Sequence, residues 1–244
     1  MHDLRGQVAV VTGGARRLGR SIVLALAQAG CHVAISYRHS EDAARDTAAA
    51  ACRAGVRALA VRGNVADAGD VAGLLDTTLG AFGRIDILVA NAGSFRRTPW
   101  ASLTEADWDA TMADNLRSAF LCAHRFGLHM YAQGSGAIVT LADVAGLRPW
   151  GDYLPYSVAK ACVIALTQAL ATELAPLVRV NAIAPGPVLF PDDYDPLLRQ
   201  REIERTLLRR QGRPANIADA VLALLGNDYI TGAILPVDGG RLLS

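Results

Sequence analysis

The chain has 244 residues, 52% of them hydrophobic, and a formal net charge of +1. This length and composition suit one α/β domain with a large core. The near-neutral charge excludes the strongly basic surfaces that bind nucleic acid or anionic membranes. No apolar run reaches the ~18–20 residues of a membrane helix, and the start of the chain lacks the apolar stretch of a secretory signal, so we expect a soluble cytoplasmic protein. The four widely spaced cysteines predict neither a metal site nor a disulfide framework.

Short apolar runs alternate with longer helical stretches along the whole chain. Several of these runs are hydrophobic at consecutive positions, which is typical of parallel strands covered by helices on both faces. The alternation predicts a single domain, residues 1–244, with a doubly wound α/β fold and a parallel, seven-stranded sheet. The expected strands are 8–11, 33–37, 58–61, 85–90, 137–141, 178–183 and 233–237, and the expected helices are 18–29, 42–54, 67–82, 105–131, 155–175 and 214–225.

A glycine-rich turn, TGGARRLG from Thr12 to Gly19, joins the first expected strand to the first expected helix. Gly13 and Gly14 permit a tight turn, and Gly19 lets the helix pack closely on the sheet. The backbone N–H groups at the start of the helix would then face a pyrophosphate. This strand–turn–helix context predicts a Rossmann-type dinucleotide site that includes Gly13, Arg16, Arg17, Leu18 and Gly19.

The end of the second expected strand indicates which dinucleotide binds. An NAD site usually has an Asp or Glu there to hold the ribose 2′-hydroxyl, whereas this chain has no carboxylate before Glu41. Arg38 and Ser40, with Arg16, suit a 2′-phosphate instead, so we predict NADPH. Further cofactor contacts are expected where strands two to four end, at Tyr37, Arg38, His39, Ser40, Asn64, Val65, Asn91, Ala92 and Gly93.

Tyr156 and Lys160 form a candidate catalytic pair near the start of the helix expected at 155–175. Their i, i+4 spacing places them on one face of the helix. A phenol with a pKa near ~10 is a poor acid at neutral pH. A neighbouring ammonium stabilises the phenolate and brings the phenol pKa toward the working range. The pair therefore predicts proton transfer to a small-molecule substrate.

The helix at 155–175 is apolar or small nearly all round. A helix that buries only one face normally carries a polar stripe on the other. One side of this helix can cover the sheet, so the other side requires a second apolar partner. We therefore expect self-association, most simply as a homotetramer.

The segment from Pro185 to Arg210 interrupts the alternation of strands and helices. It follows the sixth expected strand, holds four prolines and includes Asp192, Asp193 and Asp195 before a charged, helix-like stretch. An insertion after the carboxyl end of a strand lies over the ligand site in folds of this kind. We therefore expect a substrate lid around residues 185–210.

Together these motifs resemble the short-chain dehydrogenase/reductase family over nearly the whole chain. The matching segments are TGGARRLG, the Asn91–Gly93 triplet, Asn115, YSVAK at 156–160, the Pro185–Gly186 turn and VDGG at 237–240. The resemblance implies that Tyr156 donates a proton, Lys160 holds the nicotinamide ribose and Asn115 supports a water relay. It also implies that Pro185 and Gly186 contact the cofactor.

Two positions depart from the general family pattern. Arg17 replaces the second turn glycine, and Asp143 replaces the active-site serine thirteen residues before the tyrosine. An ionised Asp has no proton to donate to a carbonyl oxygen, so it suits a substrate with N–H groups or a C=N bond. Both departures resemble the pteridine reductase and dihydromonapterin reductase branch, which also has counterparts of Phe95 and Tyr153. This branch implies substrate contacts from Arg17, Phe95, Asp143, Tyr153 and Tyr156, and we expect NADPH-dependent reduction of a pterin C=N bond.

Two other functions remain open from the sequence. The first is a carbonyl reductase of 3-oxoacyl thioesters or small ketones, in which Arg96, Arg97 and Arg209 attract an acidic carrier. The second is an NADPH-binding sensor without turnover. The retention of Tyr156, Lys160 and Asn115 favours an enzyme over a sensor.

Overall fold

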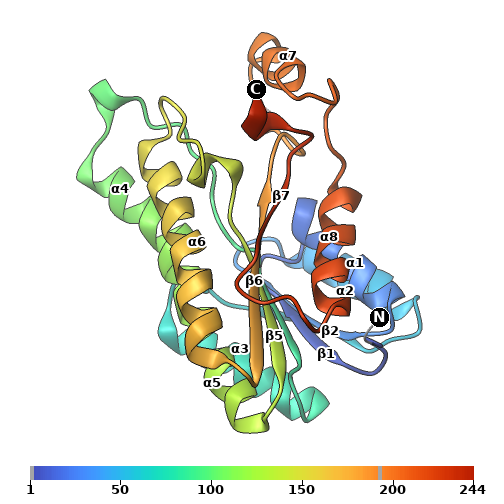
Figure 1. Cartoon of the computed structure of the whole chain (residues 1–244). Coiled ribbons are helices and arrows are strands. Elements are labelled where there is room, and N and C mark those ends of the chain that lie inside the picture. The colour runs from blue at the N-terminus through green and yellow to red at the C-terminus, as the bar shows by residue number, and fades with distance from the viewer. Residues whose placement is uncertain (1–2, 192–193) are drawn as a thin grey trace.

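The computed structural model describes residues 3–191 and 194–244, and these form a seven-stranded parallel sheet with helices on both faces (Figure 1). The strand order is β3-β2-β1-β4-β5-β6-β7, which confirms the predicted doubly wound architecture. The strands are β1 (Val8–Val11), β2 (His32–Tyr37), β3 (Ala58–Arg62), β4 (Ile87–Ala90), β5 (Gly136–Leu141), β6 (Val178–Pro185) and β7 (Ile234–Val237).

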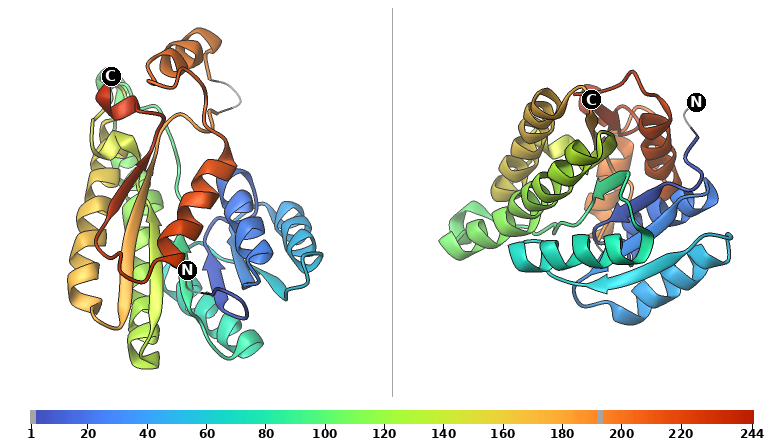
Figure 2. Two further views of the ribbon diagram at one scale, coloured as in Figure 1. Left: turned by 45° about the vertical axis from the view of Figure 1, so that its right-hand side comes forward. Right: turned by 90° about the horizontal axis from the view of Figure 1, so that it is seen from below.

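The strands are apolar at consecutive positions because each face of the sheet meets its own helical layer (Figure 2). In β1, Ala9 and Val11 belong to one core cluster, and Val10 belongs to another on the opposite face. The helices are α1 (Arg17–Gln28), α2 (Glu41–Cys52), α3 (Ala68–Phe82), α4 (Glu105–Met112), α5 (Ser118–Gln133), α6 (Leu154–Leu174), α7 (Pro196–Glu204) and α8 (Pro214–Gly226).

The strand order reverses between β1 and β4, which lie side by side although β2 and β3 separate them in the chain. Ligands of doubly wound folds bind at this reversal, outside the carboxyl ends of the strands. Here the Asn91 side chain donates to the Thr12 carbonyl oxygen at 2.8 Å, and the Thr12 hydroxyl accepts from the Ala92 N–H at 2.9 Å. These bonds hold the two strand ends together at the point where a site is expected.

The helix expected at 105–131 is interrupted. α4 ends at Met112, a π-helical segment covers Ala113–Arg117, and α5 begins at Ser118. A single π turn inserts one residue without disturbing the apolar pattern on either side, so periodicity alone does not detect it. Asn115 lies inside this segment, and its side-chain amide donates to the Thr111 carbonyl oxygen at 3.0 Å.

From the sequence we expected no segment as long and apolar as a membrane helix. By length and composition α6 meets both criteria, and among the described residues no other helix does. Of its most apolar window, 44% is buried inside the fold, and α6 packs along β6. The core helix of a water-soluble protein has the same composition, so one such helix is weak evidence for a membrane span.

Candidate active site

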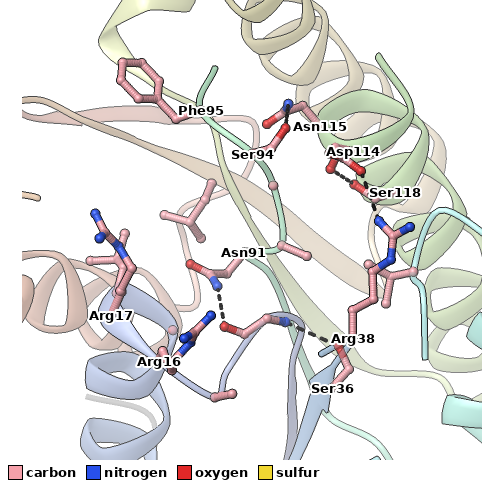
Figure 3. Close-up of a pocket in the computed structure, with 18 of the residues that line it drawn as sticks. Arg16, Arg17, Ser36, Arg38, Asn91, Ser94, Phe95, Asp114, Asn115 and Ser118 are labelled. Carbon is pink, nitrogen blue, oxygen red and sulfur yellow. Dashed lines mark hydrogen bonds and ion pairs between the residues drawn. The ribbon is translucent and has the colours of Figure 1, made fainter. Parts of the chain in front are cut away.

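Two adjoining cavities open at the carboxyl edge of the sheet. The inner cavity, about 510 Å³, runs from the glycine-rich turn to Tyr156 (Figure 3). The outer cavity, about 1390 Å³, lies between the loop at Phe95, the segment 148–153 and α7. The residues that line both are Arg17, Phe95, Asp143, Tyr156, Gly186 and Leu189. A ligand in one cavity would therefore meet a ligand in the other beside Asp143 and Tyr156.

The glycine-rich turn has the shape of an anion cradle. Gly13 adopts a φ of +62°, and a Cβ on Gly19 would lie 2.3 Å from the Gly13 carbonyl oxygen, so neither position accepts a larger residue. α1 begins without a side-chain cap and without an acidic residue in its first turn. Its first N–H groups therefore face the inner cavity with the partial positive charge that a pyrophosphate needs. The turn fits the predicted dinucleotide.

Arg17 connects the turn to the lid. Its φ is +53°, a left-handed conformation that costs a non-glycine residue about 1 kcal/mol or more. The family's glycine would adopt it freely. The Arg17 guanidinium donates to the Phe190 carbonyl oxygen at 3.0 Å, across 173 positions of sequence. Arg17, which we expect to contact both cofactor and substrate, lines both cavities.

The end of β2 presents the expected basic group to the inner cavity. Tyr37, Arg38, His39 and Ser40 all line it. The Arg38 guanidinium lies 3.7 Å from the Asp114 carboxylate, which is also 3.8 Å from Arg96 (Figure 3). Sequence reasoning missed Asp114, although it directly precedes Asn115 on the π-helical segment.

Asn115 offers a buried, unpartnered oxygen. The residue is 1% exposed, and its Oδ1 accepts no hydrogen bond from the described residues. A Cβ on Gly93 would lie 2.7 Å from this oxygen, so the glycine keeps access to it open. A buried acceptor of this kind normally binds a water molecule or a ligand donor.

Three side chains meet at the junction of the cavities. The Tyr156 hydroxyl donates to Asp143 Oδ2 at 2.8 Å, and the Ala145 N–H donates to Asp143 Oδ1 at 2.8 Å. Lys160 Nζ donates to the Leu141 carbonyl oxygen at 2.7 Å and lies 5.7 Å from the centre of the Tyr156 ring. Tyr156 and Lys160 are buried. Asp143 thus occupies the place that its spacing from Tyr156 predicts.

The electrostatics of this group correct one expectation from the sequence. Burial, and then the Asp143 charge, raise the pKa of Tyr156 well above its ordinary value instead of lowering it. Burial also raises the pKa of Asp143 to about 6, although Ala145, Lys160 and Tyr156 oppose that rise. Burial lowers the pKa of Lys160 to about 8. The predicted lowering of the phenol pKa was wrong because the hydroxyl is buried and because a carboxylate, not the ammonium, contacts it.

The outer cavity combines aromatic rings with paired arginines. The Phe95 ring stacks on Tyr153 with 4.6 Å between centroids, and it meets the edge of Tyr156 at 4.9 Å. Burial raises the pKa of Tyr153 to about 12. Arg97 forms an ion pair with Asp152 at 2.6 Å. Arg209, expected beside Arg96 and Arg97, is not among the residues that line either cavity.

Described residues of the segment 185–210, which we expect to form a lid, line the outer cavity. The chain leaves β6 through Pro185 and Gly186, and Phe190, Tyr194 and Leu198 then line the outer cavity (α7 lies near the C-terminus in Figure 1). A Cβ on Gly186 would lie 2.6 Å from Asp238, so this turn requires glycine. Asp192 and Asp193 lie outside the described residues.

Most of the predicted site residues come together in the inner cavity. All of the predicted cofactor contacts and Asn115 line it, and Tyr153 lines only the outer cavity. Sequence reasoning missed Ser94, Ser118, Trp150 and Tyr194, which also line these cavities. Their side chains follow no local motif, so only the fold brings them to the site.

Comparison with known proteins identifies the family. A family model described as enoyl-(acyl carrier protein) reductase matches residues 13–241. The chain is 39% identical to a 3-oxoacyl-[acyl-carrier-protein] reductase of Synechocystis over 100% of both chains. It is 37% identical to the corresponding reductase of Staphylococcus aureus over 96% of this chain and 98% of that one. A short-chain dehydrogenase/reductase variant of Serratia marcescens matches with a TM-score of 0.92 and 35% identity, covering 99% and 100% of the two chains.

These relatives overturn the pterin interpretation. The curated relatives are named 3-oxoacyl-[acyl-carrier-protein] reductase or ketoacyl reductase, and this activity is the alternative that the sequence left open. The prediction rested on Arg17, Phe95 and Asp143, three positions that also match the pteridine reductase branch. In the structure, Phe95 stacks on Tyr153, and Arg17 bonds to the lid backbone. Both residues thus have structural contacts that do not require a pterin. The chain belongs to the short-chain dehydrogenase/reductase family of oxidoreductases.

Proposed function

We propose that this protein is an NADPH-dependent reductase of the ketone group of 3-oxoacyl thioesters. One juxtaposition carries the proposal: Tyr156 and Asp143 line both the cavity that fits a dinucleotide and the larger cavity beside it. The whole-length similarity to 3-oxoacyl-[acyl-carrier-protein] reductases supports the substrate class. The four cysteines are unpaired, as is usual in a reducing compartment, which supports a cytoplasmic enzyme with a small-molecule substrate.

The residues at the junction suit proton delivery to a ketone oxygen. A bound nicotinamide dinucleotide would supply the hydride. The raised pKa keeps Tyr156 protonated but makes it a weak acid. It can still donate its proton once hydride transfer gives the substrate oxygen alkoxide character, because an alkoxide is a stronger base than a phenolate. Lys160 places a cation beneath the Tyr156 ring, and Asn115 Oδ1 is open to a water that could resupply the proton. Asp143 can donate to the same substrate oxygen only while it is protonated.

Steady-state oxidation of NADPH tests this function. Acetoacetyl thioester should support turnover. Crotonyl thioester offers a C=C bond and no ketone oxygen to accept the Tyr156 proton. It should react at less than about a hundredth of that rate, which is the order that general acid catalysis contributes. The crotonyl arm also tests the enoyl reductase description of the family model. NADPH binding without turnover of either thioester would indicate a sensor.

The cofactor preference should depend on Arg38. We expect at least tenfold tighter binding of NADPH than of NADH, about 1.4 kcal/mol, because the end of β2 is basic and lacks a carboxylate. Arg38→Asp should reverse this preference when the two dissociation constants are measured by titration. Arg53→Asp, on an exposed arginine outside both cavities, is the matched control. Equal affinity of the natural chain for both cofactors would contradict the assignment.

We also propose a homotetramer that buries the outer face of α6. The exposed positions of this helix are Leu154, Val158, Ala161, Ala165, Gln168, Ala169, Thr172 and Glu173. The first four leave an apolar stripe in solvent, and the polar residues lie only in the last two turns. Light scattering should give four times the 25.7 kDa chain mass. Ala165→Arg should lower that mass, because it places a charge in the buried contact. A natural chain that is monomeric, or a variant that stays tetrameric, would refute this interface.

A further inference from the structure

We propose that the outer cavity contains an aryl subsite, so that the preferred 3-oxoacyl thioesters carry an aromatic ring on the ketone carbon. This inference rests on the proposed function and names its substrate class. The chain has only three Trp, six Tyr and five Phe residues, yet six of these line this one cavity. They are Phe95, Trp150, Tyr153, Tyr156, Phe190 and Tyr194.

The rings on one side form a packed wall. Phe95 and Tyr153 stack with an interplanar angle of 13°, and the Trp150 ring stands edge-on to both, at 6.3 Å and 6.1 Å. The backbone fixes this wall, because the Thr98 N–H donates to the Asp152 carbonyl oxygen at 2.6 Å. Rings held in this way offer faces and edges to a planar ligand at little cost in side-chain entropy.

The lid supplies the opposite side. The Phe190 and Tyr194 rings lie 5.0 Å apart, and the Arg199 guanidinium covers Phe190 at 5.5 Å. Besides burial, the Tyr194 phenol contributes to the raised pKa of Tyr153, so this lid residue and the wall lie close to each other. An aromatic substituent would therefore be enclosed by rings from two separate elements.

The wall begins at the reacting position. The Tyr156 ring is at 82° to Phe95 with 4.9 Å between centroids, so the proton donor is itself part of the wall. A ketone whose oxygen accepts from Tyr156 must direct one of its two substituents along Phe95 and Trp150. This placement separates the ring substituent from the thioester arm.

An anionic substituent would suit the lining of the outer cavity less well than an aryl group. The arginines that line it are held by acceptors of the protein itself. Arg97 pairs with Asp152, and buried Arg241 donates twice to Glu202 at 3.0 Å. Arg148 donates to the Ser244 carbonyl oxygen. An anionic substituent would share these guanidinium groups with protein acceptors, most of which are carboxylates that would repel it, whereas an aryl group needs only the ring surfaces.

The test compares two thioesters with six carbons beyond the ketone. Benzoylacetyl N-acetylcysteamine carries them as a ring, and 3-oxononanoyl N-acetylcysteamine carries them as a chain. Trp150→Leu should lower kcat/KM for the benzoylacetyl thioester about tenfold and for the 3-oxononanoyl thioester less than about threefold. Trp100→Leu is the matched control, because Trp100 is 77% exposed and lines neither cavity. Comparing variants on each substrate cancels the intrinsic reactivity of the two ketones.

Phe190→Leu, on the lid, repeats the test from a separate element and decides the matter if Trp150→Leu does not fold. Equal losses on both thioesters, or no loss on the benzoylacetyl thioester, would overturn the aryl subsite. Turnover of acetoacetyl and 3-oxononanoyl thioesters without turnover of the benzoylacetyl thioester would overturn the aryl subsite and leave the proposed function standing. Failure to reduce any of the three would instead overturn the proposed function.

Discussion

Tyr156→Phe is expected to lower kcat/KM for acetoacetyl thioester by at least about a hundredfold, because a positioned acid contributes that much or more. The variant removes only the hydroxyl that donates to Asp143 at 2.8 Å and leaves the ring packed against Phe95. NADPH binding, measured by fluorescence titration, should change by less than about twofold, because no cofactor contact requires that proton.

Two further variants calibrate this result. Tyr229→Phe removes the hydroxyl of a tyrosine that is 98% exposed and should leave the rate unchanged. Lys160→Ala should weaken both turnover and NADPH binding, since Lys160 lines the inner cavity. Retained activity in Tyr156→Phe would mean that another group donates the proton.

Asp143→Ser is expected to raise ketone reduction near pH 8 by about tenfold or more, because a single donor at a developing oxyanion is worth that order of rate. Near pH 8 the natural Asp143, with a pKa of about 6, is ionised and repels the developing charge. A serine hydroxyl donates to that oxygen at any pH. The variant therefore replaces repulsion with a hydrogen bond.

The pKa values of Asp143 and Lys160 determine how kcat/KM should change with pH. Because the pKa of Asp143 is raised to about 6, its donating form is populated below that value and lost as the pH rises through it. Lys160, with a pKa of about 8, loses its charge above that value. The kcat/KM of the natural enzyme should therefore fall first near pH 6 and again near pH 8. Asp143→Ser should remove the first fall and move the second to lower pH, because the Asp143 charge, acting against burial, raises the pKa of Lys160. A variant that is slower than the natural enzyme at every pH would show that the carboxylate itself is required.

The fold was predictable because its signals are local and repeated. Every strand of the sheet is a short apolar run, and the glycines at 13 and 19 occupy positions where a Cβ would collide or the backbone is left-handed. The π-helical segment around Asn115 was not predictable, since its sequence ADNLR contains no Gly or Pro that marks an irregular turn. The composition of α6 does not by itself decide its role, because length and hydropathy alone do not distinguish a packed core helix from a membrane span.

The site was predictable in position but not in energetics. The i, i+4 spacing placed Tyr156 and Lys160 on one face of a helix, and the inner cavity contains both. The direction of the Tyr156 pKa shift depends on the depth of burial and on the 2.8 Å contact with Asp143, which no sequence spacing provides. The substrate was the least predictable feature. Arg17, Phe95 and Asp143 match the pteridine reductase branch, whereas relatives that match nearly the whole chain are named for 3-oxoacyl substrates.

Deuterium transfer from NADPH that carries deuterium at both C4 positions follows the reacting atoms directly. A mixture of acetoacetyl thioester, crotonyl thioester and a dihydropterin is incubated with the enzyme, and the products are read by mass spectrometry. A 3-oxoacyl thioester reductase should place one deuterium on C3 of 3-hydroxybutyryl thioester and none on the other two compounds. Label in the crotonyl or pterin product, or no label in any product while NADPH remains bound, would contradict the proposed function.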